Sequence, residues 1–154
     1  EDKEKAQAFL AGLSKIYRYI LEQRNESTST VVEELNFAKQ YLDLQRMRFE
    51  NSIQLKTEIS EGAMTKKIPS LSLQLLLENA IKHNGFDETN PLHVEIIEEQ
   101  DKLSIKNNRK ARRNIATSDG VGLQNINDRY KLLTNRQLVI DVKEDYFTVK
   151  LPLI

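Results

Sequence analysis

Hydrophobic positions recur every three or four residues in the first third of the chain. In residues 5–25, Phe9, Leu13 and Ile20, with Ile16 or Tyr17 between them, share one helical face. A second stripe in residues 30–51 begins at a capping box formed by Thr30 and Glu33. The members of this stripe are Val31, Leu35, Ala38, Leu42 and Phe49. The pattern predicts two amphipathic helices that pack as a hairpin on the rest of the protein.

The period then changes to two. Ile53, Leu55 and Ile59 alternate with polar residues, which predicts a half-buried strand. Residues 61–67 have no clear period and are predicted to be a loop. Pro69 and Ser70 should then open a mostly apolar helix that includes residues 75–84.

Two hairpins complete the predicted elements. Residues 93–99 and 102–108 alternate and are joined around Gln100–Asp101, while residues 137–154 fold back at Glu144–Asp145. In the second hairpin, the residues facing one another are Leu138, Ile140 and Val142 on one strand and Phe147, Val149 and Leu151 on the other. Residues 109–135 between the hairpins form a basic loop and a helix. This order predicts an α+β fold: a mainly antiparallel sheet with helices on one face, preceded by a helical arm.

Composition narrows the class of protein. A chain of 154 residues suits one domain, or one small domain with a helical extension, and the absence of cysteine excludes disulfides and thiolate chemistry. With 23 basic and 23 acidic residues, no overall charge favours nucleic acid or an anionic membrane, and we expect contact with neither. No apolar run approaches the roughly 20 residues that span a bilayer. Because the first residue is Glu1 rather than Met, we expect a piece of a longer protein.

The apolar helix carries four polar side chains close together: Glu78, Asn79, Lys82 and His83. Asn79, Lys82 and His83 share one face, since they are three and four positions apart. A surface ion pair would explain Glu78 with Lys82, but an amide among leucines is costly unless it has a partner. On these residues alone, a structural cluster and a binding site both stay open.

Two glycines open the next predicted helix. Gly120 and Gly122, followed by Leu123, let the backbone approach a ligand, and the N–H groups of a first helical turn suit a phosphate. The preceding loop holds four cations without an acid among them: Arg109, Lys110, Arg112 and Arg113. A solvated loop and an anion-binding loop are both compatible with that run. Asn107 shares parity with Leu103 and Ile105, so it points inward at the end of a strand, where an amide could contact a base edge.

Four blocks of the sequence are similar to the LytS/YehU-like sensor histidine kinases of the GHKL ATPase superfamily. They are "LSKIYRYIL", "EELNFAKQYLDLQRMRFEN", "IPSLSLQLLLENAIKHN" and "GVGLQNINDRYKLL", and together they cover nearly the whole chain. The resemblance implies a Bergerat-type ATP-binding fold. It also implies that Asn79 ligates the Mg²⁺ of Mg-ATP, that Lys82 and His83 lie near the phosphates, and that Gly120 and Gly122 form the second glycine box.

The chain departs from the family in two places. Asn107 stands where the family has an adenine-contacting Asp, and no glycine occurs from Phe86 to Asp119, so the first glycine box is not intact. We expect the Asn107 amide to contact adenine instead. The phosphoacceptor block is also missing, since the only histidines are His83 and His93. The acceptor should therefore lie upstream of Glu1.

We therefore expect the ATP-binding part of a protein-histidine kinase, with residues 1–27 belonging to the dimerisation and phosphoacceptor helices and residues 28–154 to the catalytic domain. The expected partners are a response regulator, whose aspartate receives the phosphate, and a second copy bound through residues 1–27 and the helices upstream. The resemblance implies the cytoplasmic part of a bacterial inner-membrane protein. Glu78 could orient a water or act as a base. Alternatives are a degenerate module that dimerises or docks a partner, and a GHKL ATPase without histidine transfer.

Overall fold

The computed structural model describes residues 1–110 and 121–154 of the chain. The helices are α1 (Asp2–Gln23), α2 (Val31–Phe49), α3 (Glu61–Met64), α4 (Ser72–His83) and α5 (Val121–Leu133), with a 3-10 turn η1 (Glu50–Ser52). The strands are β1 (Thr28–Thr30), β2 (Ile53–Glu58), β3 (Lys67–Pro69), β4 (Leu92–Glu99), β5 (Lys102–Asn108), β6 (Val139–Val142) and β7 (Tyr146–Pro152). Arg112, Arg113 and Gly120 lie outside the described residues.

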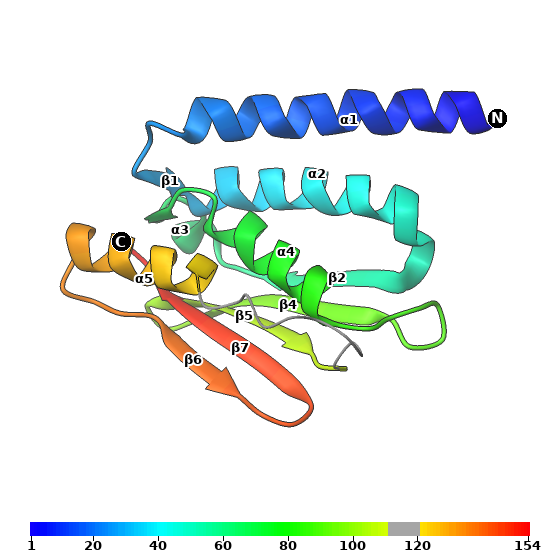
Figure 1. Ribbon diagram of the computed structural model, residues 1–154. Coiled ribbons are helices and arrows are strands. Elements are labelled where there is room, and N and C mark those ends of the chain that lie inside the picture. The colour runs from blue at the N-terminus through cyan, green and yellow to red at the C-terminus, as the bar shows by residue number, and fades with distance from the viewer. Residues whose placement is uncertain (111–120) are drawn as a thin grey trace.

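The main sheet has five strands in the order β2-β4-β5-β7-β6. Only the β2–β4 pair is parallel, and the other three pairs are antiparallel. Figure 1 shows the helices gathered over one face of this sheet. The predicted α+β class, with a mainly antiparallel sheet and helices on one side, is confirmed.

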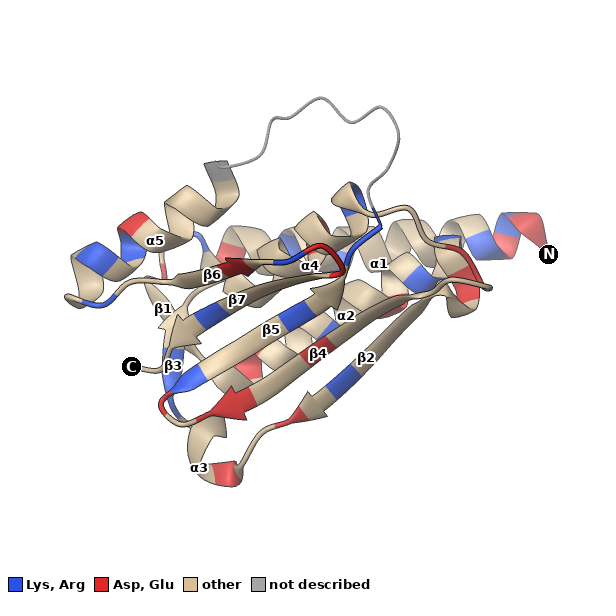
Figure 2. Ribbon diagram, turned by 90° about the horizontal axis from the view of Figure 1, so that it is seen from below, with Lys and Arg blue, Asp and Glu red and all other residues tan. Residues whose placement is uncertain are grey.

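Alternation along the strands separates the two faces of the sheet. Leu103 and Ile105 of β5 and Val149 and Leu151 of β7 are buried under the helices. The opposite face is polar, and Figure 2 shows basic and acidic positions interspersed along it. A pair such as Lys56 and Glu58, whose Nζ and Oε1 lie 2.8 Å apart, is typical of this face. The period of two therefore predicts correctly the buried side chains of β5 and β7, but not those of β6, whose residues Val139–Val142 are all exposed.

Helices α1 and α2 form the predicted hairpin (Figure 1). Between the two predicted options, Ile16 is buried and Tyr17 is exposed. The rings of Tyr19 and Phe37 stack with their centroids 4.1 Å apart. A Cβ at Gly12 would lie 2.8 Å from Leu44 Cδ1, so glycine permits the close approach of the two helices.

Residues 61–67 were predicted to be a loop, but this prediction was wrong. They contain α3 and the first residue of β3. The Ser60 hydroxyl caps α3 by accepting a hydrogen bond from the Ala63 N–H. Strand β3 then pairs with β1 in a small antiparallel sheet, with Ser29 opposite Ile68. Each strand has three residues, too few for a periodic signal.

The predicted start of the apolar helix was also wrong by a few residues. Pro69 ends β3, and α4 begins at Ser72 after Leu71, which adopts a left-handed φ of 66°. This turn redirects the chain from the small sheet into α4.

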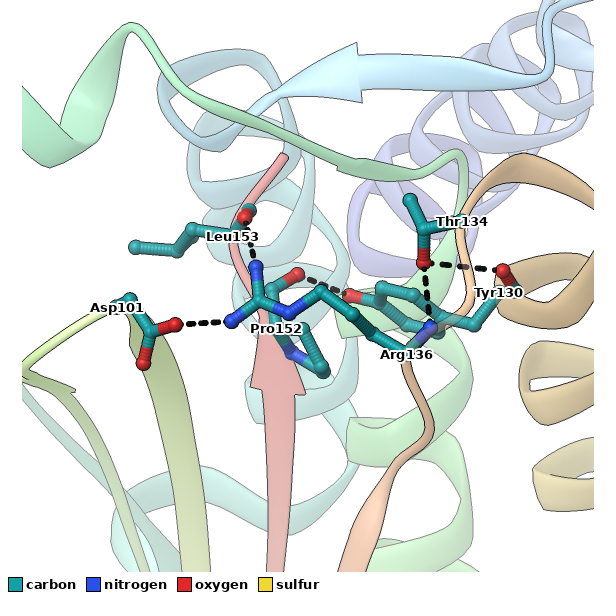
Figure 3. A network of polar contacts seen from close by, with 6 residues as sticks. All are labelled: Asp101, Tyr130, Thr134, Arg136, Pro152 and Leu153. Atoms are coloured by element: carbon teal, nitrogen blue, oxygen red, sulfur yellow. Dashed lines mark hydrogen bonds and ion pairs between the residues drawn. The ribbon is translucent and has the colours of Figure 1, made fainter.

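Helix α5 is fastened to the sheet near its C-terminal end, as Figure 3 shows. The Tyr130 hydroxyl donates to the Pro152 carbonyl over 2.8 Å, and Arg136 Nη1 donates to the Leu153 carbonyl over 2.8 Å. Arg136 also forms an ion pair with Asp101 in the β4–β5 turn. These contacts fix α5 against the ends of β5 and β7.

Candidate nucleotide site

The polar residues of α4 continue a stripe that contacts the start of α5. Leu75, Asn79, Lys82 and His83 follow one another at steps of four, three and one, so they lie along one side of the helix. A Cβ at Gly122, in the first turn of α5, would lie 3.1 Å from Leu75 Cδ2. The first turn of α5 therefore packs against α4 one helical turn before Asn79.

The residues of this stripe are all at least partly accessible. Leu75, Asn79 and His83 are half-buried and Lys82 is exposed. No hydrogen bond joins the Asn79 amide to another described residue. The amide is therefore not committed to the described part of the fold, unlike the polar residues at the start of the helix.

Asn84 fastens the end of α4 to the segment that follows β5. Its Nδ2 donates to the Ala80 carbonyl over 2.8 Å, and its Oδ1 accepts from the Lys110 N–H over 2.9 Å. The Gly85 N–H donates to the Lys110 carbonyl over 2.8 Å. These bonds bring the end of β5, with Asn107, beside the end of α4, with His83. Sequence analysis missed Asn84, although an asparagine followed by glycine is a typical helix C-terminus.

Arg109 extends this connection to the β6–β7 turn. Its backbone N–H donates to the Asp145 carbonyl over 2.7 Å and its Nη1 to the Lys143 carbonyl over 2.6 Å. The beginning of the basic loop is thus held in place on both sides.

Asn107 is 5% exposed on the inner face of β5, beside Ile105, as its parity predicts. Its Nδ2 donates to the Asn108 carbonyl over 2.8 Å, and because a carbonyl can only accept, this bond fixes which end of the amide is nitrogen. Among the described residues, no fully buried side-chain oxygen or nitrogen lacks a partner. None of the described residues donates a hydrogen bond to the Asn107 Oδ1.

An uncovered apolar surface lies beside Asn107. The strand register places Asn107 opposite Phe147, and Phe147 opposite Val142. Ile140 and Val142 lie on the inner side of the sheet, yet their exposed fractions are 47% and 57%. Apolar side chains next to a single hydrogen-bond acceptor are what a flat heteroaromatic ring requires.

Glu78 lies on the exposed side of α4. It accepts a hydrogen bond from Gln74 Nε2 over 2.8 Å. Burial, and to a smaller extent the negative charge of Glu78, raise the pKa of Tyr41 in α2 to about 12. Leu123, by contrast, packs partly buried against the core, so its part in a site would be to set the position of α5.

A buried carboxylate caps the start of α4. Glu34 of α2 is 1% exposed, and its Oε1 accepts from the Leu71 N–H over 2.6 Å while its Oε2 accepts from the Leu73 N–H over 3.1 Å. Ser29 Oγ donates to Oε1 over 2.6 Å. Burial raises the pKa of Glu34, and these hydrogen bonds and the Arg129 charge act in the opposite direction. Sequence analysis gave Glu34 no role, because a Glu–Glu pair in a first helical turn is typical of an exposed position.

The similarity to known proteins agrees with this geometry. A family model described as Histidine kinase matches residues 1–53. The sensor protein LytS of Enterococcus faecalis is 36% identical over 107 residues, which are 68% of this chain and 18% of LytS. The chain belongs to the LytS-like sensor histidine kinases. The sensor protein kinase HptS of Staphylococcus aureus is 30% identical over 138 residues, 90% of this chain and 25% of HptS.

Solved histidine kinase structures share the fold of this LytS-like chain at low sequence identity. The cytoplasmic segment of histidine kinase QseC matches with a TM-score of 0.56 and 12% identity, covering 97% of this chain and 94% of that one. Histidine kinase ThkA in complex with the response regulator protein TrrA matches with a TM-score of 0.53 and 15% identity, covering 94% and 48%. The chain spans about a fifth to a quarter of the length of LytS and HptS. None of the described helices is long and apolar enough to cross a membrane.

Proposed function

We propose that residues 28–154 are the ATP-binding catalytic domain of a two-component sensor histidine kinase. The domain binds Mg-ATP, its γ-phosphoryl group is transferred to a histidine N-terminal to residue 1, and the phosphate then passes to an aspartate of a response regulator. The observation that supports the proposal is the junction of α4 and α5, where Leu75, one helical turn before Asn79, lies against Gly122 in the first turn of α5. A phosphate group suits this junction, because the N–H groups of a first helical turn attract anions.

The side chains present fit Mg-ATP. Asn79 supplies an amide oxygen, a ligand type that Mg²⁺ accepts, from a side chain without a bond to the described residues. Lys82 and His83, together with the backbone of Gly122, lie near the phosphates. At the other end Asn107 accepts from the exocyclic amine of adenine through Oδ1, and the ring lies against the uncovered apolar surface at Phe147, Val142 and Ile140.

The chemistry asked of the protein is mainly positioning and charge neutralisation. Bound Mg²⁺ would neutralise phosphate charge during transfer, as in other phosphoryl-transfer enzymes. Lys82 adds a positive charge near the phosphates. Glu78, one residue before Asn79 and exposed, is positioned to orient a water or to accept a proton, while its bond to Gln74 holds its carboxylate in place.

A homodimer through α1 is supported by the outer side of that helix. Leu10, Tyr17 and Leu21 have exposed fractions of 60%, 59% and 64% and are separated by seven and four positions, as in a helix-packing seam. Residues 1–27 would then contact a second copy along this seam.

Since ThkA is found in complex with its response regulator, we propose a response regulator as a partner of this chain as well. We also place the domain on the cytoplasmic side of a bacterial inner membrane.

Two proteins test the proposal: the 154-residue chain, and a longer protein that includes the segment before residue 1. We expect both to bind Mg-ATP, and only the longer one to gain acid-labile phosphate from γ-labelled ATP, on a histidine in the added segment. Asn79→Ala in the longer protein should reduce this labelling. Stoichiometric labelling of His83 or His93 would contradict the assignment of the acceptor.

The substitution of Asn for the expected acid at position 107 favours a second candidate, a module that dimerises or docks a partner without binding nucleotide. Calorimetry on the 154-residue chain separates the two. Absence of heat from Mg-ATP, with an intact dimer, would favour the second candidate.

A further inference from the structure

Arg129 of α5 is bonded to two backbone segments far from it in sequence. Its Nη1 donates to the Ser70 carbonyl over 2.6 Å, directly before α4, and its Nη2 donates to the Ser27 carbonyl over 3.1 Å, in the connector between α1 and α2. The Ser70 N–H also donates to the Ser27 carbonyl over 3.2 Å. One arginine thus joins α5, the start of α4 and the end of the helical arm.

Glu34 forms the second half of the same cluster. It caps α4 through the N–H groups of Leu71 and Leu73, and it accepts from Ser29 in the connector. Ser29 Oγ lies 3.3 Å from Ser70 Oγ. The opposite charges of Glu34 and Arg129 attract each other. Against the effect of burial, the Arg129 charge lowers the pKa of Glu34 and the Glu34 charge raises the pKa of Arg129, so each favours the ionised form of the other.

The two helices held by this cluster are the ones that form the proposed phosphate-binding junction. Arg129 lies seven positions after Gly122, two turns along the same side of α5. Leu75 and Asn79 lie one and two turns after the Glu34-capped start of α4. A shift of the connector at Ser27 or Ser29 would therefore change hydrogen bonds that orient both α4 and α5.

We propose that Glu34 and Arg129 are positioning residues that couple the α1–α2 connector to the nucleotide site, so that nucleotide binding and the conformation of the connector depend on each other. The inference rests on the proposed ATP site. It assigns to the cluster a role beyond stability. If the conformation of the connector changes the affinity for nucleotide, then bound nucleotide must change the conformational equilibrium of the connector by the same free energy.

The Ser70 amide reports this coupling, since it is bonded to the connector carbonyl of Ser27. Its hydrogen exchange can be measured by NMR in the 154-residue chain with and without Mg²⁺ and a non-hydrolysable ATP analogue. The Ile105 amide in β5 serves as the internal reference for global opening. We expect the analogue to slow exchange at Ser70 about tenfold more than at Ile105, a factor within the usual range for coupled sites.

Arg129→Met should reduce this excess protection to less than about twofold, and Arg129→Lys, which can keep one of the two carbonyl bonds, should restore part of it. The matched control is Arg136→Met. Arg136 also holds a main-chain carbonyl and an acid, but it contacts the C-terminal strand and Asp101, not the connector (Figure 3). That variant should lose stability and keep the full response. Ser29→Ala, which removes the hydroxyl bonded to Glu34 and Ser70, gives a milder variant if Arg129→Met does not fold.

The outcomes separate the two proposals. If the parent chain does not bind the analogue, the proposed ATP site is wrong. If it binds the analogue without excess protection at Ser70, or if Arg129→Met and Ser29→Ala respond as fully as Arg136→Met, the site stands and the coupling is wrong.

Discussion

The two halves of α4 carry polar residues in different states. At the start, Ser72 and Gln74, like Ser70 just before the helix, are 0%, 8% and 1% exposed, and each side chain has a partner. Toward the end, Asn79 and His83 are half-buried and Lys82 is exposed. The difference shows that polarity within an apolar helix has two origins. Buried polar groups with hydrogen-bond partners hold the start of the helix in place, while the more accessible groups further along are the ones that we propose to contact a ligand.

The largest expected effect is on the free energy of unfolding and concerns Glu34, which caps the start of α4. Glu34→Ala leaves the N–H groups of Leu71 and Leu73 and the charge of Arg129 without their buried partner, which we expect to cost about 3–5 kcal/mol of unfolding free energy. Urea denaturation measures this. The control is Glu33→Ala, which removes an exposed capping-box residue and should cost about 1 kcal/mol. Equal losses for the two variants would mean that the buried cluster contributes no more than an ordinary cap.

The next effect is on the affinity for Mg-ATP and concerns Asn79 in the second half of α4. Asn79→Ala removes a metal or charge-assisted contact worth about 1.5–3 kcal/mol, so the affinity for Mg-ATP should fall about tenfold to a hundredfold. The unfolding free energy should stay within about 0.5 kcal/mol, since Asn79 has no bond to the described residues. Calorimetry gives the affinity, and Asn36→Ala, at an exposed position of α2, is the control. An unchanged affinity would remove Asn79 from the site.

A smaller effect is expected at the base. Asn107→Ala removes one neutral hydrogen bond of about 1 kcal/mol, so ATP should bind about fivefold more weakly and the preference for ATP over GTP should shrink. In Asn107→Asp, the carboxylate would accept a stronger hydrogen bond from the exocyclic amine of adenine. Its second oxygen, however, would face the Asn108 carbonyl oxygen to which Nδ2 now donates. We therefore expect lower stability in that variant, whatever its affinity. Binding of ATP and GTP to the three proteins tests the assignment, which fails if neither substitution alters affinity or preference.

The last effect appears only at alkaline pH and links Glu78 of α4 to the core. Burial and Glu78 raise the pKa of Tyr41 to about 12 in the folded protein, whereas an unfolded tyrosine ionises near its ordinary value of about 10. The contribution to stability is therefore complete below about pH 10 and is lost as the pH rises toward 12, at up to about 1.4 kcal/mol per pH unit. Tyr41→Phe should flatten the alkaline decline of the unfolding free energy. An identical decline in Tyr41→Phe would assign it to other groups.

Much of the fold follows from local sequence patterns. The Thr30–Glu33 capping box, the inward parity of Asn107 and the turn at Glu144–Asp145 were all predicted correctly. Each depends on residues within a few positions of one another. The family resemblance added the grouping of α4 with the start of α5, which periodicity alone could not provide.

The features that were missed depend on contacts distant in sequence. Strands β1 and β3 have three residues each and acquire their structure by pairing across about forty positions. Helix α4 begins later than Pro69 predicts, because the small sheet continues to that residue. Glu34 and Asn84 look like ordinary helix-terminal residues in the sequence, and only the packed chain shows that each fastens a second element.

The left-handed Leu71 before α4 has a consequence for how the chain folds. Leucine offers no side-chain acceptor, so the first turn of α4 has no local cap. Its cap is Glu34, 37 and 39 positions earlier than the two N–H groups that it accepts. Closing a loop of that length is entropically costly before any contact compensates for it. The beginning of α4 should therefore become ordered only when α2 is already in place, so the helix that bears Asn79 is completed late in folding.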